Sequence, residues 1–166
     1  LARSYDDAND KEIAIKIMFS MLKQAEQLND EKEIAYSLAS LAHFKTFTNN
    51  PDNILEYFAR SMNIYKELGD RQGTADIYLG LSYYYKNQIY QPDSILYYSK
   101  LSAEIYRELG NKIKLSTSLV TIGRLYRLQK DWDLSLNYYN QALDLVPDQK
   151  ADADVLFYIL GNIAIL

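Results

Sequence analysis

The six residues YKELGD at positions 65–70 return as YRELGN at positions 106–111, 41 residues further along the chain. A second pair of segments has the same spacing: NPDN at 50–53 and QPDS at 91–94, with KDWD at 130–133 in the corresponding place of a third copy. Self-similarity at a fixed period is the sequence signature of a repeat architecture. The sequence therefore predicts a tandem array of repeats. The two recurring segments are expected to lie at the ends of the secondary-structure elements.

Each recurring segment has the composition of a helix boundary. Gly followed by Asp or Asn suits a helix C-terminus that leads into a new helix, and Pro followed by Asp suits a first helical turn, where the missing N–H costs nothing. Between the boundaries, apolar residues recur at spacings of three and four, as in Leu119, Ile122 and Leu125. This periodicity predicts helices. Each unit is then a hairpin of two helices that buries its apolar face only by stacking on its neighbours.

The residues inside each hairpin resemble the tetratricopeptide repeat family. The third unit follows that family's pattern most closely, and the second matches it without an insertion. The first departs from the pattern, with Lys45 where Tyr is usual and Ile54 where a small residue is usual. The positions that carry the match are Leu119, Ile122, Gly123, Tyr126, Ser135, Tyr139, Ala142 and Pro147 in the third unit, Tyr78, Leu81, Ser82, Tyr85, Ser94, Tyr98 and Leu101 in the second, and Leu38, Leu41, Ala42, Phe58 and Ser61 in the first.

The resemblance implies an all-α fold, a right-handed tetratricopeptide-type α-α superhelix built from helix hairpins. We expect a single array over residues 1–166 that is a piece of a longer protein. Its predicted parts are the second helix of a partial repeat at 10–30, whole repeats at 31–70, 71–111 and 112–150, and the first helix of a truncated repeat at 151–166.

Composition excludes several functions. The formal net charge is −4, which disfavours nucleic-acid binding by this segment. There is no Cys, and His43 is the single His, so neither a metal site nor a nucleophile–base pair is expected. We predict no enzymatic activity and no cofactor. No stretch is long and apolar enough for a membrane span.

The 16 tyrosines have mainly structural explanations. Tyr85, Tyr98, Tyr126 and Tyr139 are expected to pack in the core. Tyr83, Tyr84 and Tyr85 are consecutive, so at least one of them must point outward from a helix. Tyr83 is expected to point outward, on the helix face that the resemblance implies for binding and that is described next.

In tetratricopeptide proteins the first helix of each hairpin lines the concave surface. By register, the resemblance implies a binding surface made of Tyr36, His43, Asp76, Leu79, Tyr83, Lys86, Thr117, Val120, Arg124, Arg127, Tyr158 and Asn162. Arg124 and Arg127 are one helical turn apart. They either hold a carboxylate or phosphate, or are solvated and pair with acids such as Asp76.

We therefore expect a non-catalytic scaffold that binds a protein or peptide. Its Tyr-rich repeats of about 40 residues resemble those in sensor regions of bacterial signalling proteins. The alternative is a structural spacer or oligomerisation module, with a homodimer formed through an exposed end repeat. The sequence leaves the compartment open: a sensor-kinase context would place the chain in the bacterial periplasm, and the cytoplasm is the alternative.

Overall fold

The computed structural model describes residues 2–48, 51–146 and 161–164, and for residues 2–9 it describes the backbone alone. Every regular element in these ranges is a helix, so the prediction of an all-α, tetratricopeptide-type fold is confirmed. The chain forms two compact units, residues 1–80 and 81–166. Tyr158, one of the predicted binding residues, lies outside the described residues.

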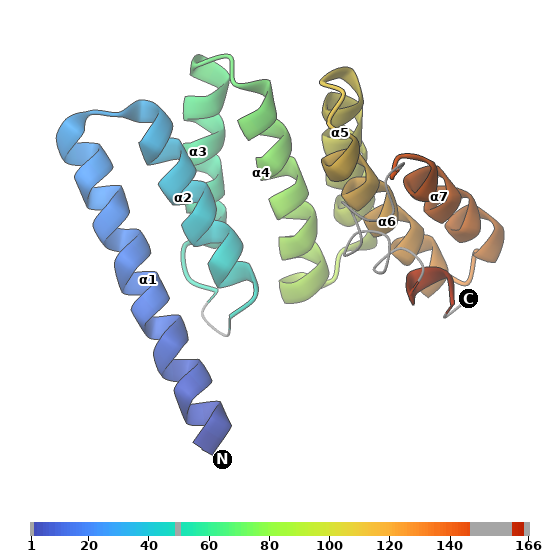
Figure 1. Cartoon of the computed structure of the whole chain (residues 1–166), viewed down its shortest axis with the longest axis horizontal. Helices are drawn as coiled ribbons and strands as arrows, with labels where there is room; N and C mark the ends of the chain where they lie inside the picture. Colours follow the sequence, from blue (N-terminus) through green and yellow to red (C-terminus); the bar gives the residue numbers. More distant parts are fainter. Residues whose placement is uncertain (1, 49–50, 147–160, 165–166) are drawn as a thin grey trace. The chain divides into compact units, whose positions relative to one another are not determined.

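The first unit contains α1 (Ala2–Leu28), α2 (Glu31–Thr46), α3 (Ile54–Glu67) and most of α4 (Arg71–Tyr84). Helix α1 packs on α2, and α2 packs on α3. Leu38, Leu41 and Phe58 form the centre of this core and are at most 1% exposed. The N-terminal half of α1 extends beyond the neighbouring helices of its unit (Figure 1).

Close helix packing in the first unit depends on small residues. The Ser61 hydroxyl on α3 donates a hydrogen bond to the Ala35 carbonyl oxygen on α2, with a distance of 2.7 Å. A Cβ atom added to Gly80 of α4 would lie 2.7 Å from ring atoms of both His43 and Phe58. Since real Cβ contacts are not this short, these backbones approach closely only because the positions are small.

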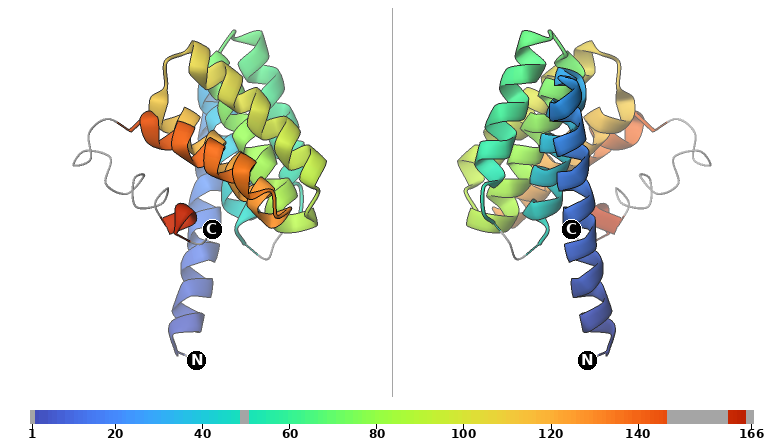
Figure 2. Two further views of the ribbon diagram at one scale, coloured as in Figure 1. Left: turned by 90° about the vertical axis from the view of Figure 1, so that its right-hand side faces the viewer. Right: turned by 90° about the vertical axis from the view of Figure 1, so that its left-hand side faces the viewer.

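The second unit contains the end of α4, a π-helix η1 (Tyr85–Ile89), α5 (Pro92–Glu108), α6 (Lys112–Leu128) and α7 (Trp132–Asp144). Helix α6 packs on both α5 and α7, and Figure 2 shows α5, α6 and α7 in yellow to orange. Tyr106, Tyr139 and Ile122 are among its largest buried side chains. Between α5 and α6, the hydroxyls of Ser102 and Ser118 lie 2.9 Å apart in a buried hydrogen bond.

The tyrosines pack in two ways. Tyr139 is fully buried, as predicted. Tyr85 and Tyr98 are only partly buried and stack on each other with ring centroids 5.6 Å apart. Tyr126 stacks in the same way on Tyr138, also at 5.6 Å. These paired rings are explained by packing within the unit.

One short motif connects most of the helices. A residue with positive φ ends the first helix, and the following Asp or Asn begins the next. In the segment Tyr65–Gly73, Gly69 has φ +66°, the Asp70 N–H bonds to the Tyr65 carbonyl at 2.8 Å, and the Asp70 carboxylate accepts from the Gly73 N–H at 2.8 Å. The same arrangement recurs at Asn29-Asp30, Gly110-Asn111 and Lys130-Asp131. The predicted Gly-Asp boundary is therefore a C-cap joined to an N-cap.

The prediction that Pro followed by Asp lies in the first turn of a helix is correct for Pro92 and wrong for Pro51. Pro92 is in the first turn of α5, as expected. Pro51, in contrast, precedes α3, which begins at Ile54. Here Asn53, with φ +63°, turns the chain into the helix. Pro51 therefore belongs to the connecting turn and not to the helix.

Candidate functional site

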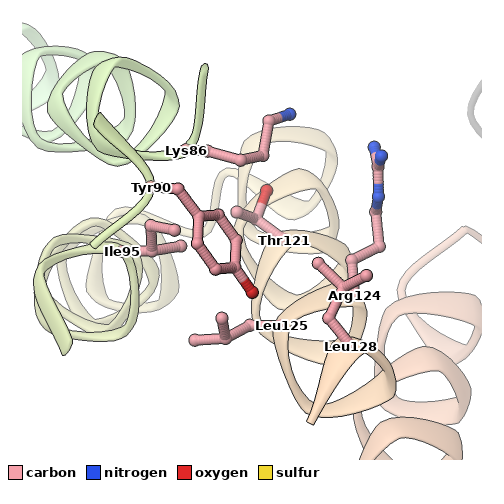
Figure 3. Close-up of a pocket in the computed structure, with 7 residues that line it drawn as sticks. All are labelled: Lys86, Tyr90, Ile95, Thr121, Arg124, Leu125 and Leu128. Atoms are coloured by element: carbon pink, nitrogen blue, oxygen red, sulfur yellow. The ribbon is translucent and has the colours of Figure 1, made fainter. Parts of the chain in front are cut away.

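A recess in the second unit is a candidate site, and it is lined by side chains from the η1 region, α5 and α6. Its interior is small, about 30 Å³, and reaches about 340 Å³ only when the open space at its mouth is counted. Its apolar lining comes from Tyr90, Ile95, Leu125 and Leu128, and its polar lining from Lys86, Thr121 and Arg124. In Figure 3 the charged ends of Lys86 and Arg124 point to the same side of the recess, while the Tyr90 ring lies over the apolar side chains.

The recess lies beside a turn that is wider than its counterpart in the next hairpin. In the connection between α6 and α7, the Asp131 N–H bonds to the carbonyl of Tyr126, five residues earlier. In the connection before α5, the Gln91 N–H bonds to Tyr85, six residues earlier. The wider turn is the π-helix Tyr85–Ile89. No residue is inserted, because α5 begins correspondingly later than α7 relative to Ser94 and Ser135. Single π turns of this kind occur frequently at functional sites.

The π-helix also sets the position of Tyr90. This residue ends η1 in the left-handed conformation, with φ +52°. The conformation is unfavourable for a side chain larger than Asn or Asp. It turns the chain toward Pro92, the first residue of α5, and leaves the Tyr90 ring in the recess.

Two cations share this recess. Burial lowers the pKa of the Lys86 ammonium, and the positive charge of Arg124 lowers it further. The Lys86 Nζ lies 5.0 Å from the centroid of the Tyr83 ring, a cation–π contact. Lys86, Tyr83 and Arg124 were all predicted from the sequence to belong to the binding face, and the structure brings them together.

Arg127 is placed differently from its helical neighbour Arg124. Its Nε is buried without a hydrogen-bond partner among the described residues, as is the Tyr139 hydroxyl. Burial raises the pKa of Tyr139, and the neighbouring Ser135 hydroxyl, followed by Arg127 and the charge of Arg124, partly offsets this effect. Arg127 therefore affects the pKa of the buried Tyr139 phenol, and it is not among the residues that line the recess.

The other predicted residues of the second unit differ in accessibility. Thr117 is half-buried, and its hydroxyl donates to the Ile113 carbonyl at 3.0 Å. Val120 and Asn162 are buried, at 1% and 7% exposure. Side chains buried to this degree offer little surface to a partner.

The predicted residues of the first unit likewise include one buried side chain. Tyr36 is 55% exposed and Leu79 only 4%. His43 is half-buried and contacts the Phe58 ring edge-to-face, with centroids 5.4 Å apart. Asp76 accepts a hydrogen bond from Gln72 at 3.3 Å. A single binding face that runs through both units stays a prediction.

Sequence reasoning missed the apolar half of the recess. Tyr90, Ile95, Leu125 and Leu128 were not among the expected binding residues. The spacing from Ser82 to Ser94 equals that from Gly123 to Ser135, so the repeat register gives no sign of the π turn between them.

The helical-repeat geometry agrees with the comparison of the sequence with family models. Residues 91–148 match the model of the tetratricopeptide repeat. This segment contains tetratricopeptide repeats. The matched segment covers α5, α6 and α7, and these repeats supply Ile95, Arg124 and Leu125 to the recess.

Comparison with solved structures also indicates a helical-repeat fold for the chain. It is similar to the crystal structure of BtubC (BKLC) from P. vanneervenii, a helical repeat protein, with a TM-score of 0.76 and 17% sequence identity. The similarity covers 93% of this chain and 65% of that one, so this chain spans less than two thirds of that protein's length. The comparison with curated proteins gave no match.

No cluster of three or more His, Asp or Glu side chains within residues 2–48, 51–146 and 161–164 could hold a metal ion. None of the helices described is both long and apolar enough to cross a bilayer. Tetratricopeptide repeats are typically non-catalytic scaffolds that mediate protein–protein interactions.

Proposed function

We propose that this chain is a non-catalytic protein-binding module, and that a peptide segment of its partner docks on Tyr83, Lys86 and Arg124. The family carries the general part of the proposal, because tetratricopeptide repeats mediate protein–protein interactions. The cation–π pair of Tyr83 and Lys86, 5.0 Å apart and beside Arg124, supports the specific part. Partly buried aromatic and Arg side chains are the residue types that contribute most to binding energy at interfaces.

The test is a pull-down with the whole chain and with the double variant Tyr83→Ala/Arg124→Ala. The matched control is Tyr97→Ala/Lys100→Ala, which also removes one aromatic ring and one cation, from exposed positions of α5 in the same unit. We expect the first variant to lose at least one captured protein that the control retains. Equal capture of every protein by the two variants would contradict the proposal.

The second candidate function is self-association or spacing, and one observation favours it. Ile13, Ile17, Met21 and Leu28 lie on one face of α1 and are all more than 40% exposed. A contiguous apolar face of this kind commonly marks an interaction surface. Sedimentation equilibrium of the wild type and of Ile17→Lys tests this function: a concentration-dependent mass that the variant abolishes would support a homodimer, and a monomer throughout would contradict it.

The wider context follows from the resemblance to sensor regions. We infer that the module is the sensor or interaction region of a larger bacterial signalling or regulatory protein. The supporting observation is the pair of Tyr-rich repeats that end in ELGD and ELGN at residues 67–70 and 108–111. The sequence of the full-length gene product tests this inference, and the absence of any kinase or regulatory domain from it would contradict the inference.

A further inference from the structure

One side of α1 carries a row of exposed apolar residues, called here the α1 stripe. Ile13, Ile17, Met21 and Leu28 are 47%, 56%, 43% and 78% exposed. Their spacing places them on one side of the helix over about four turns. Helix α1 packs on α2, and Leu22, on the side opposite the stripe, is buried. The α1 stripe is therefore available to a partner.

At its C-terminal end the α1 stripe enters a groove between α1 and α2. The interior of this groove is about 180 Å³. Met21 and Leu28 of the stripe line its α1 side, and Asp30 and Glu33 line its α2 side at the start of that helix. The other lining residues are Gln24, Ala25 and Ser37. A partner that lies along the stripe therefore meets two carboxylates at one end.

The two carboxylates of the groove are available to a cation. Neither Asp30 nor Glu33 forms an ion pair within residues 10–48, 51–146 and 161–164. The Asp30 Oδ1 atom accepts the Glu33 N–H at 3.1 Å, which leaves its second carboxylate oxygen for a partner. The surroundings are also negative: burial raises the pKa of Tyr65, and the charges of three carboxylates, Glu33 among them, raise it further. A positive charge is therefore favoured at this end of the groove.

An α-helix fits this surface better than an extended segment. The backbone N–H and C=O groups of α1 and α2 bond within their own helices, so the surface cannot pair with an added strand. A helix satisfies its own backbone, and its rows of side chains four residues apart pack against rows of the same spacing. The stripe has this spacing from Ile13 through Ile17 to Met21.

A basic partner fits the groove better than a second copy of this chain. The formal net charge of the chain is −4, and the two charged residues of the groove are both acidic. Two copies would bring like net charges together, whereas a basic segment complements the groove.

We propose that the α1 stripe and its groove bind an amphipathic helix of a partner protein, with a Lys or Arg at the end that reaches Asp30 and Glu33. The apolar residues of that helix contact Ile13, Ile17 and Met21, and its cation lies between the two carboxylates. The surface shares no residue with the site of the proposed function and does not depend on it. The self-association considered above uses the same face with a different occupant.

The first experiment titrates the whole chain with three acetylated, amidated peptides of about 16 residues, a length that covers the stripe. The first peptide has leucines on one helical face and two lysines in its last turn, the second has glutamates in place of the lysines, and the third has the first composition in scrambled order. Amide shifts in a ¹H–¹⁵N spectrum locate the binding site.

The lysine peptide is expected to shift the resonances of Ile17, Met21 and Glu33, and to bind at least about 10-fold more tightly than the other two. Equal binding of the glutamate or the scrambled peptide would overturn the proposal. No response to the lysine peptide, or shifts confined to other residues, would overturn it as well.

Variants connect the response to the groove and to the stripe. Asp30→Asn/Glu33→Gln removes both charges but keeps an N-cap residue, and should weaken binding of the lysine peptide by about 5-fold. Its control is Glu31→Gln, in the first turn of α2 but outside the groove lining. Ile17→Ser should weaken binding by about 10-fold, and Leu55→Ser, at a 43% exposed position of α3, is its control. Unchanged binding in either test variant with a native amide spectrum would overturn the proposal.

Sedimentation equilibrium distinguishes the other occupant, a second copy of the chain. We expect a monomer, or a dimer that saturating lysine peptide dissociates. A dimer that persists at saturating peptide and that Ile17→Lys abolishes would assign this face to self-association and overturn the proposal.

Discussion

The Ser135 hydroxyl on α7 donates a hydrogen bond of 2.9 Å to the Gly123 carbonyl oxygen on α6. Gly123 also faces the fully buried Tyr139 ring, and a Cβ on Gly123 would lie 2.7 Å from its Cε1 atom. The two helices are thus joined where neither backbone carries a large side chain. The bond from Ser61 to the Ala35 carbonyl joins α3 to α2 in the first unit in a similar way.

Gly123→Ala is expected to destabilise the second unit. Alanine favours a helix over glycine by about 1 kcal/mol, but overpacking a filled core costs about 1–3 kcal/mol, and the Tyr139 ring that the new methyl group would meet is fully buried. We expect a net loss of about 1–2 kcal/mol, measured by urea denaturation followed by circular dichroism. The control is Lys112→Ala at the exposed start of α6, which should change stability by less than about 0.5 kcal/mol. A variant as stable as the wild type would show that the α6–α7 contact tolerates a methyl group.

Lys130→Gly is expected to stabilise the chain. Lys130 occupies the left-handed C-cap position with φ +63°, where the equivalent residue before α6 is Gly110, with φ +69°. A left-handed residue other than glycine costs about 1–2 kcal/mol, part of which the entropy of glycine offsets. The expected gain is about 0.5–1 kcal/mol in the free energy of unfolding. Gly110→Ala is the reciprocal variant and should lose about 1 kcal/mol. A destabilised Lys130→Gly would contradict this account of the cap.

Tyr65→Phe is expected to change how stability depends on alkaline pH. Burial raises the pKa of Tyr65 from its ordinary value of 10.0 to about 12, and the carboxylates of Asp70 and Asp76 raise it as well. Because the folded pKa exceeds the unfolded one, the neutral phenol contributes fully below pH 10, and this contribution is lost as the pH rises from 10 to 12.

The difference in unfolding free energy between wild type and Tyr65→Phe should therefore shift by about 2–3 kcal/mol over that interval, since one pKa unit corresponds to about 1.4 kcal/mol. Urea denaturation at successive pH values measures it. Tyr97→Phe, at a position that is 59% exposed, is the control and should follow the wild type. Parallel curves for wild type and Tyr65→Phe would contradict the pKa assignment.

The sequence by itself determined the helices and most of their boundaries, because these depend on local physics. The period of 41 residues located the repeated boundaries, and Gly-Asp or Gly-Asn predicted a C-cap joined to an N-cap. Positive φ at Gly69 and Gly110 is a property of the backbone and one residue type, so no distant contact is needed to predict it. The family pattern likewise predicted that Lys86 and Arg124 lie on one face, and both line the same recess.

Only the tertiary structure decided which predicted residues are accessible and what surrounds them. Val120 and Leu79 lie on the side of their helices that was predicted to bind a partner, yet both are buried. Accessibility depends on the neighbouring helices as well as on the direction in which a side chain leaves its own helix. Arg124 lines the recess, whereas Arg127, one turn further, acts on Tyr139. The recess lies beside the π turn Tyr85–Ile89, a local change of helix geometry that leaves the Ser82–Ser94 and Gly123–Ser135 spacings equal. Sequence periodicity specifies the direction of a side chain from its own helix, and the cavity it enters depends on how separate helices pack.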